Sequence, residues 1–353
     1  MRRGFVVALM WLCLGCAGLP EAGSGDAAPC TVIENARHPG GAPARLVVQD
    51  GVVVISDAAC GEVSVIDAEG RTLVPAVIDA HVHLSYYPVD ERLASVGVAA
   101  AVDLACPMSA LGEPSAIAVL RSGPMITAPA GYPTRSWGRD GYGLECDGAE
   151  ACAAAVDLLV QAGAAVLKVP LDHGPALSDA ALEAVATRAH AHDRAVFAHA
   201  LDDASAARAA AFGLDVLAHT PVAPLEEHTV EAWSAGAVVS TLAAFGGSSV
   251  AVENLRRLHA AGAQVLYGTD MGNSRVAGID PREIALLEEA GLDGPAILDA
   301  ATRAPANRFG LANLGHLEPG AEASLLLLDG DPHAVPMRLA SPSLVMHRGV
   351  VQP

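Results

Sequence analysis

Short apolar runs alternate with helix-forming stretches between residues 76 and 310. Eight of these runs have the length and composition of buried strands: AVIDAHVHL, VAAAVDLAC, PMITAPA, AAVLKVPL, AVFAHA, DVLAHT, AVVSTLAAF and AQVLYGTDM. Most intervening stretches have helical periodicity, as in SDAALEAVATRAHAHDRA, where Ser178 is the predicted N-cap. This alternation predicts an α/β fold, a TIM (β/α)8 barrel. A doubly wound open sheet is the alternative, but the sequence lacks its typical phosphate loops, GxGxxG and GxxxxGKS/T.

The two ends of the chain have a different pattern. Residues 30–75 contain short β segments with turns, such as ARLVVQDGVVVIS, where Asp50-Gly51 is typical of a hairpin turn. Residues 311–353 also contain β segments, in GHLEPGAEASLLLLDGD and SLVMHRGVV. Two β pieces that flank a barrel can pair with each other. We therefore expect a small β-sandwich domain built from both chain ends, residues 30–75 and 311–353, beside the barrel at residues 76–310.

The charge of the chain limits its partners. The 353 residues carry a formal net charge of −19 at pH 7, with the acidic residues scattered rather than grouped. Such a balance disfavours nucleic acid and anionic membrane surfaces as partners. We expect a small-molecule substrate, and the sequence leaves a homo-oligomer open.

The N-terminal residues, MRRGFVVALMWLCLGCAG, contain two arginines, an apolar run and then small residues. This order is typical of a secretory signal, and the run is too short to span a bilayer as a mature helix. Its end, LCLGC, resembles a bacterial lipoprotein cleavage site with Cys16 as the acylated residue. We predict a signal peptide at 1–16, a tether at 17–29, and an exported lipoprotein of the periplasm or outer membrane. A simple cleaved signal is the alternative.

Export would permit disulfides. Five cysteines follow residue 16. Cys146 and Cys152 bracket a short loop, so we predict that they pair. Cys30 and Cys60 flank a predicted β region and form the second predicted pair, which leaves Cys106 free. A cysteine metal site is disfavoured because no CxxC pair follows residue 16.

Two histidines, His81 and His83, lie one residue apart in the first apolar run. Alternate residues of a strand share a face, so both imidazoles can bind one ion. In a TIM barrel the functional residues lie at the carboxyl ends of the strands. Four other polar residues occur at or near the corresponding ends of later runs: Lys168, His199, His219 and Asp270. Packing explains any one of the six alone, but together they predict a metal centre.

This set of six on strands 1, 4, 5, 6 and 8 resembles that of the metal-dependent amidohydrolase superfamily. The most similar branch contains the imidazolonepropionase-related and Xaa-Pro dipeptidase-like enzymes. The resemblance extends over nearly the whole mature chain. The segments that carry it are VPAVIDAHVHL, LKVPLDHGPALSDAALEAVATRAHAHDRAVFAHA, LYGTDMG, AATRAPANRFGL and LGHLEPGAEASLLLLDGDP. The chain departs from the family pattern at Ala76, where a glycine is usual, and at Ala323-Ser324, where Ala-Asp is more frequent.

The resemblance implies two divalent metal ions, most often Zn²⁺. The implied ligands are His81, His83 and Asp270 for one ion, His199 and His219 for the other, and Lys168 as a bridge. Lys168 would carry a carbamate derived from CO2, because a lysine in an apolar strand is pushed towards the neutral amine that adds CO2. Bound metal lowers the pKa of water from 15.7 to about 7. The resulting hydroxide would attack a carbonyl, and Asp270 would move the proton to the leaving nitrogen.

The implied activity is hydrolysis of a C–N bond in an amide, a cyclic amide, an N-acyl amino acid or a dipeptide. Two alternatives remain open. The same centre could hydrolyse an ester or lactone, or the chain could be a surface binding protein that kept the barrel and lost catalysis.

Substrate contacts are expected in the loop AGYPTRSWGRDGYG, which follows the third run at the mouth of the barrel. Tyr132, Arg135 and Arg139 are the predicted substrate-binding residues, because guanidinium groups suit carboxylates. Solvated loop charge is the alternative for each arginine. Four other residues follow strands without an assigned role: Tyr86, Tyr87, His173 and Arg275.

Overall fold

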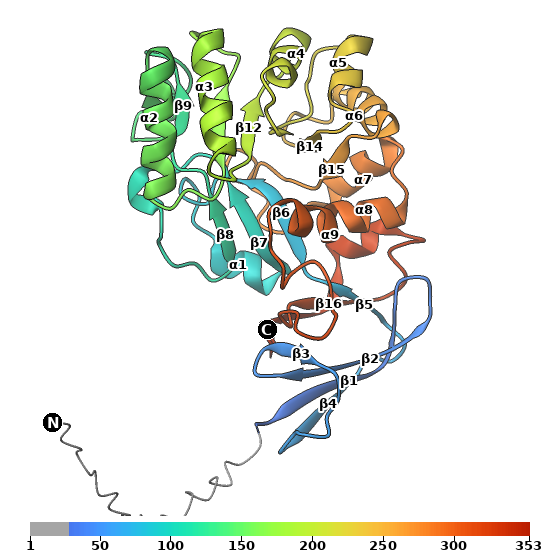
Figure 1. Cartoon of the computed structure of the whole chain (residues 1–353). Helices are drawn as coiled ribbons and strands as arrows, with labels where there is room; N and C mark the ends of the chain where they lie inside the picture. Colours follow the sequence, from blue (N-terminus) through green and yellow to red (C-terminus); the bar gives the residue numbers. More distant parts are fainter. Residues whose placement is uncertain (1–27) are drawn as a thin grey trace, which may run out of the picture.

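The computed structural model describes residues 28–353. A barrel of strands and helices lies above a smaller β domain, in the view of Figure 1. The predicted signal segment at 1–16 and the predicted tether up to residue 27 lie outside the described residues. Within residues 28–353, none of the helices has the length and apolar character needed to cross a membrane.

Strands from both ends of the described chain form one hydrogen-bonded sheet. Its members are β1 (Cys30–Arg37), β2 (Pro43–Gln49), β3 (Val52–Val54), β4 (Val63–Asp67), β5 (Thr72–Pro75), β16 (Leu325–Leu328), β17 (Pro342–His347) and β18 (Val350–Val351). β1 pairs with β2 on one side, and on the other side it pairs first with β4 and then, at Arg37, with β5. The predicted β-sandwich is therefore not confirmed, because hydrogen bonds connect all eight strands into a single branched sheet.

The hairpin and the disulfides agree with the sequence. β2 and β3 pair around Asp50 and Gly51, which both have positive φ (52° and 77°), as a tight hairpin turn requires. Both predicted disulfides are present, with Cα–Cα distances of 5.6 Å for the 30–60 pair and 5.1 Å for the 146–152 pair. Cys106 is a buried free thiol.

The wall of the barrel consists of parallel strands. They are β6 (Val77–Val82), β7 (Val98–Asp103), β8 (Ala118–Arg121), β9 (Met125–Thr127), β10 (Gly143–Glu145), β11 (Leu167–Pro170), β12 (Val196–His199), β13 (Val216–Leu217), β14 (Ala237–Val239) and β15 (Gln264–Leu266). Their hydrogen bonds form three groups, β6–β8, β9–β10 and β11–β15, rather than one closed sheet. The fold is thus TIM-barrel-like, with gaps in the hydrogen bonding of the wall.

One gap lies between β8, which the sequence did not predict, and β9, which lies within the predicted third run PMITAPA. β8 pairs with β7, whereas β9 contacts β11. At the other junction, the backbone N–H of Ala80 donates to Tyr267 O, and that of Asp270 donates to His81 O, both at 2.9 Å. These bonds hold the first strand against the segment after β15.

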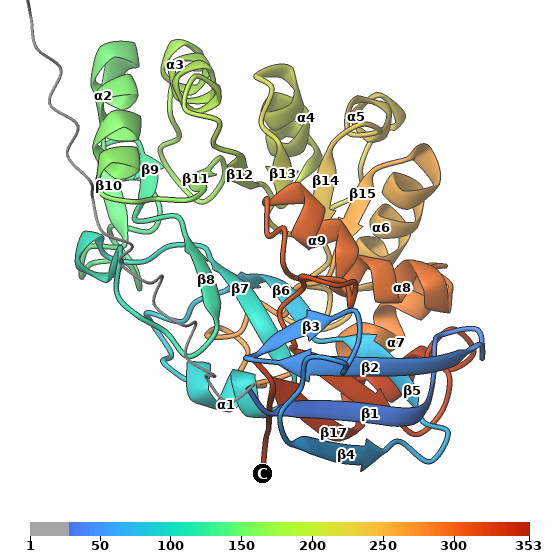
Figure 2. The same cartoon turned by 60° about the horizontal axis from the view of Figure 1, so that its bottom comes forward.

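Helices surround the strands (Figure 2). They are α1 (Asp90–Ser95), α2 (Gly148–Gln161), α3 (Asp179–His190), α4 (Asp203–Ala211), α5 (Glu227–Ala232), α6 (Ser249–Ala261), α7 (Pro281–Glu289), α8 (Gly294–Ala301) and α9 (Arg303–Arg308). Ser178 is the N-cap of α3, as predicted, and its side chain accepts a hydrogen bond from Ala181 N. Between β7 and β8 the chain forms only a short 3₁₀ turn, η1 (Met108–Ala110). A second such turn, η2 (Pro336–Ala340), precedes β17.

Apolar side chains fill the centre of the barrel. Those on the inner side include Ala80, Val102, Phe197, Val216, Ala237 and Leu266, all fully buried. Phe197 also packs against Phe309 of the segment after α9, with ring centroids 5.6 Å apart. The polar residues at the carboxyl ends of the strands therefore lie next to a closely packed apolar layer.

Candidate metal centre

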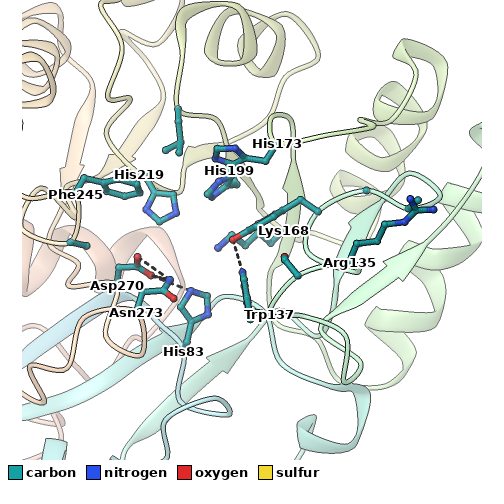
Figure 3. A pocket seen from close by; sticks show the side chains of 16 residues that line it. His83, Arg135, Trp137, Lys168, His173, His199, His219, Phe245, Asp270 and Asn273 are labelled. Atoms are coloured by element: carbon teal, nitrogen blue, oxygen red, sulfur yellow. Dashed lines mark hydrogen bonds and ion pairs between the residues drawn. The ribbon is translucent and has the colours of Figure 1, made fainter.

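The six residues predicted as metal ligands come together at the carboxyl ends of the barrel strands. His81 lies in β6 and His83 directly after it, Lys168 lies in β11, His199 ends β12, His219 follows β13, and Asp270 follows β15. All six are buried. Figure 3 shows His83, Lys168, His199, His219 and Asp270 around one pocket.

Asp270 and the His81/His83 pair form one compact group. Oδ1 of Asp270 lies 3.1 Å from Nε2 of His83 and 3.5 Å from Nε2 of His81. One donor atom from each of the three residues lies within 4.8 Å of the others, which is close enough to hold a single ion.

Lys168 and the remaining histidines lie next to this group. Nζ of Lys168 is 3.2 Å from Nε2 of His81 and donates to the backbone O of Leu104 at 3.4 Å. The ring of His219 lies 4.4 Å from that of His81 and 4.9 Å from that of His199, measured between centroids. The lysine amine therefore stands among imidazoles, and the two halves of the predicted centre are contiguous.

Hydrogen bonds orient two of the imidazoles. Nδ1 of His81 lies 2.7 Å from the backbone O of Ala218, and because a carbonyl only accepts, this nitrogen carries the proton. Nδ1 of His219 lies 3.1 Å from the hydroxyl of Thr241. Nε2 of His81 is thereby left with its lone pair towards Lys168 and Asp270, and Nε2 of His219 is left for a ligand role.

Burial controls the protonation of the group. Burial lowers the pKa of Lys168 to about 8 and lowers the pKa of both His81 and His219 well below the usual range. Burial alone would raise the pKa of Asp270, but the neighbouring His81 and His83 outweigh it, and the pKa is lowered. Burial thus favours the neutral form of His81 and His219, while the carboxylate of Asp270 stays ionised.

This donor set fits a divalent metal ion. Nδ1 of His83 and both ring nitrogens of His199 are buried without a hydrogen-bond partner among the described residues. Buried polar atoms in folded proteins normally have a hydrogen-bond partner. These nitrogens have none within the described residues, so they need a partner from outside the protein. Neutral imidazoles and carboxylates are the donors that zinc prefers.

The loop that carries Asp270 is fixed from below by Asp79. The hydroxyl of Thr269 donates to Oδ2 of Asp79 at 2.5 Å, and its backbone N–H donates to Oδ1 at 3.1 Å. Gly272 packs directly against His83, because a Cβ at position 272 would lie 2.6 Å from the Cβ of His83. The sequence YGTDMG is therefore needed for close packing as well as for its carboxylate.

The pocket above the centre has a volume of ≈ 570 Å³ and an aromatic wall. Tyr132 and Arg135 line it as predicted, whereas Arg139 lies outside the lining and donates to the backbone O of Arg135 at 3.2 Å. The Trp137 indole donates to the Tyr132 hydroxyl at 2.7 Å, and the Tyr132 ring stacks on His199 with centroids 5.1 Å apart.

Several pocket residues were missed by sequence reasoning. Trp137, Phe245 and Asn273 line the pocket, and the Asn273 amide donates to both carboxylate oxygens of Asp270, at 3.1 and 3.2 Å. Each of the three follows a barrel strand, which was the only signal in the sequence. His173 also lines the pocket, whereas the guanidinium of Arg275 stacks on the ring of Tyr87, 4.7 Å from its centroid.

Comparison with known proteins shows the same fold. Solved structures of the same fold include a Xaa-Pro dipeptidase with bound methionine, which is 18% identical with a TM-score of 0.76 over 91% of this chain and 99% of that one. A putative prolidase from Bifidobacterium longum is 22% identical, with a TM-score of 0.75 over 92% of this chain and 95% of that one. A. niger ochratoxinase is 20% identical, with a TM-score of 0.73 over 92% and 96%.

These identities are low, and the likeness shows the fold. A sequence model adds the family: the model of the Amidohydrolase family matches residues 72–352, from β5 through the whole barrel to the last strand. The superfamily predicted from the sequence motifs is thus confirmed, and the chain belongs to the amidohydrolase family.

Proposed function

We propose that this chain is a metal-dependent hydrolase that cleaves a C–N bond with two divalent ions, of which zinc suits the donors best. The observation that carries the proposal is Lys168. Its amine is 1% exposed, is surrounded by imidazoles, and lies 3.2 Å from His81 Nε2. Burial of a lysine without a hydrogen-bonded carboxylate is energetically costly. Conversion of its amine to an anionic metal ligand explains why the residue is buried here.

In this proposal the two halves of the centre hold one ion each. The ligands are His81, His83 and Asp270 for the first ion, His199 and His219 for the second, and carboxylated Lys168 for both. The neutral amine of Lys168 attacks CO2 and loses a proton, which forms an N–C bond and an anionic carbamate. When bound, the ions supply Lewis acidity and make water more acidic.

Asp270 performs the proton transfers. Its carboxylate lines the pocket, and the Asn273 amide holds both of its oxygens in place. It accepts a proton from the attacking water as the C–O bond forms, and it donates that proton to the leaving nitrogen as the C–N bond breaks. The lowered pKa of Asp270 keeps its carboxylate ionised before the reaction begins.

The pocket supports an N-acyl amino acid or a dipeptide as substrate. Arg135 is exposed and lines the pocket, and its guanidinium suits a substrate carboxylate. Trp137 and Phe245 offer apolar surface for a side chain. The names of the fold relatives, Xaa-Pro dipeptidase and prolidase, point to the same kind of bond.

The first experiment combines elemental analysis with an activity screen. We expect about two metal ions per chain and hydrolysis of some N-acyl amino acids or dipeptides, with fewer ions in Lys168→Ala. Hydrolysis of matched esters or lactones without hydrolysis of any amide would replace the C–N assignment with an esterase. Absence of metal after refolding with zinc and bicarbonate would refute the hydrolase and leave a binding protein.

We also propose that the protein is exported and anchored through Cys16. The two disulfides support this proposal, because such bonds persist in oxidising compartments. Growth with a labelled fatty acid tests it: the label should enter the wild-type protein and be absent from Cys16→Ala.

A further inference from the structure

Asp172 and His173 follow β11, four and five residues after Lys168, and both approach His199. Oδ1 of Asp172 lies 3.2 Å from Nε2 of His199 and 3.6 Å from Nε2 of His173. One donor atom from each of the three residues lies within 4.8 Å of the others. This group contains one residue of the proposed centre and two residues that the centre does not use.

The contact between Asp172 and His199 is incomplete. Their side chains are 9% and 7% exposed, and neither Oδ1 of Asp172 nor Nε2 of His199 has a hydrogen-bond partner among the described residues. The two atoms are close enough to bond, but the N–H direction does not suit them. Two buried polar atoms that face one space without pairing indicate a third partner between them.

The carboxylate of Asp172 is held in this direction by the backbone. Its other oxygen, Oδ2, accepts a hydrogen bond from Leu201 N at 2.7 Å. Because that bond ties Asp172 to the chain two residues beyond His199, Oδ1 is fixed on the side of the imidazole. The orientation is therefore a property of the fold and does not depend on a mobile side chain.

His173 completes the group from the pocket side. Its φ is 62°, a left-handed conformation that is unfavourable in a residue other than glycine. Its ring packs against Tyr132, with centroids 5.7 Å apart, and it lines the pocket beside His199 (Figure 3). The strained backbone thus presents an imidazole to the same space as the Asp172 carboxylate.

We propose that Asp172, His173 and His199 form a further divalent-cation site in the wall of the pocket. Two imidazoles and one carboxylate suit zinc and leave open positions for water or a substrate oxygen. The site rests in part on the proposed function because it shares His199 with the centre. Both ring nitrogens of His199 are unpartnered among the described residues, so one can face the centre and the other can face Asp172. When an ion is bound on each side, the ring would lose its remaining N–H proton to water and bind both ions as an imidazolate.

The test counts zinc ions in four proteins. Metal-free wild type, His173→Asn, Asp172→Asn and the control His190→Asn are dialysed against buffered Zn²⁺ and analysed for metal. Asparagine tolerates a left-handed φ at position 173, and at position 172 it can still accept from Leu201 N. His190 pairs with Asp215 on the surface at 3.0 Å, which makes it a matched histidine–carboxylate pair away from the pocket.

We expect wild type and His190→Asn to bind one ion more than His173→Asn and Asp172→Asn, or to bind that ion at least about tenfold more tightly. Equal numbers and equal affinities in all four proteins would overturn the proposal. So would a loss of affinity in Asp172→Asn alone, because Asp172 would then only orient His199. Thermal melts monitored by circular dichroism identify any variant that fails to fold.

Lys168→Ala separates this site from the proposed centre. If both the centre and the further site exist, Lys168→Ala loses ions of the centre and keeps the ion of the further site. His173→Asn then shows the opposite result: it keeps the ions of the centre and loses the ion of the further site. If the centre fails and the further site stands, wild type binds one ion that depends on His173 and not on Lys168. If wild type binds no zinc at any Zn²⁺ concentration, both the proposed centre and the further site are refuted.

Discussion

The amine of Lys168 lies 3.2 Å from Nε2 of His81, and within the described part of the chain no carboxylate forms an ion pair with it. An unpaired cation in this interior would face a large desolvation cost. The pKa of Lys168 is accordingly lowered by burial to about 8. The lysine is thus prepared for a chemistry that uses its neutral form.

The carbamate on Lys168 is the first prediction. Wild type incubated with ¹³C-bicarbonate and zinc should show a carbamate carbon by NMR, and Lys168→Ala should not. The variant should also lose at least about a hundredfold in activity, because a bridging ligand matters more than the groups that merely orient ligands. Added short carboxylic acids should restore part of the activity by occupying the space of the missing group. An unmodified lysine in fully active wild type contradicts this prediction.

The second prediction concerns the support of the Asp270 loop. Thr269→Val removes the hydroxyl that donates to Asp79 and leaves a buried carboxylate oxygen unpaired. We expect a loss of about 2–3 kcal/mol in the free energy of unfolding, measured with urea. Thr269→Ser keeps the hydroxyl and serves as the control, so its loss should be small. Similar losses in both variants would assign the effect to the methyl group and its packing.

The third prediction concerns Glu283 in α7, a buried carboxylate outside the metal centre. It accepts hydrogen bonds from Leu242 N and Ala243 N at 2.9 and 2.7 Å. Burial nevertheless raises its pKa from 4.5 to about 7. The folded state therefore binds this proton more tightly than the unfolded state, so the contribution of Glu283 to stability is complete below pH 4.5 and is lost as the pH rises through about 7.

Urea unfolding of wild type and Glu283→Gln measures this contribution. Between about pH 5 and pH 7.5, wild type should lose about 2 kcal/mol relative to the variant, which cannot titrate at this position. Glu288→Gln, an exposed position on the same helix, should follow wild type. Parallel stability curves for wild type and Glu283→Gln would show that Glu283 does not titrate in this range.

The structure brings the six candidate metal ligands together, and two simple rules explain why the sequence could select them. The period of a strand puts His81 and His83 on one face, and the barrel brings the carboxyl ends of distant strands to one place. Local patterns predicted less where the structure depends on non-local pairing. Two such features are the branching of the β sheet at Arg37 and the pairing of β8, but not β9, with β7. Both depend on which strand pairs with each edge. The alternation of apolar and polar residues within a strand does not show which other strand it pairs with.

The loops of the site were the least predictable part. The segment between β7 and β8 contains Pro107, Gly112 and Pro114, which explains why it forms a short 3₁₀ turn and no longer helix. Trp137 and Asn273 are positioned by contacts with Tyr132 and Asp270, and their sequence neighbours carry no sign of these contacts. The pocket wall was therefore known only from the structure, whereas the six candidate metal ligands could be selected from the sequence.

The fourth prediction separates the two arginines of the pocket loop. Arg135 lines the pocket, while Arg139 donates to the backbone O of Arg135 and stays outside the lining. If Arg135 binds a substrate carboxylate, Arg135→Gln should raise KM for a carboxylate substrate about tenfold with little change in kcat, the size expected for one charged hydrogen bond. Arg139→Gln is the matched control and should leave KM near the wild-type value. Amidated substrates should not distinguish Arg135→Gln from wild type, because they have no carboxylate to lose. Equal effects of the two arginine variants, or an effect on amidated substrates, would place the carboxylate elsewhere in the pocket.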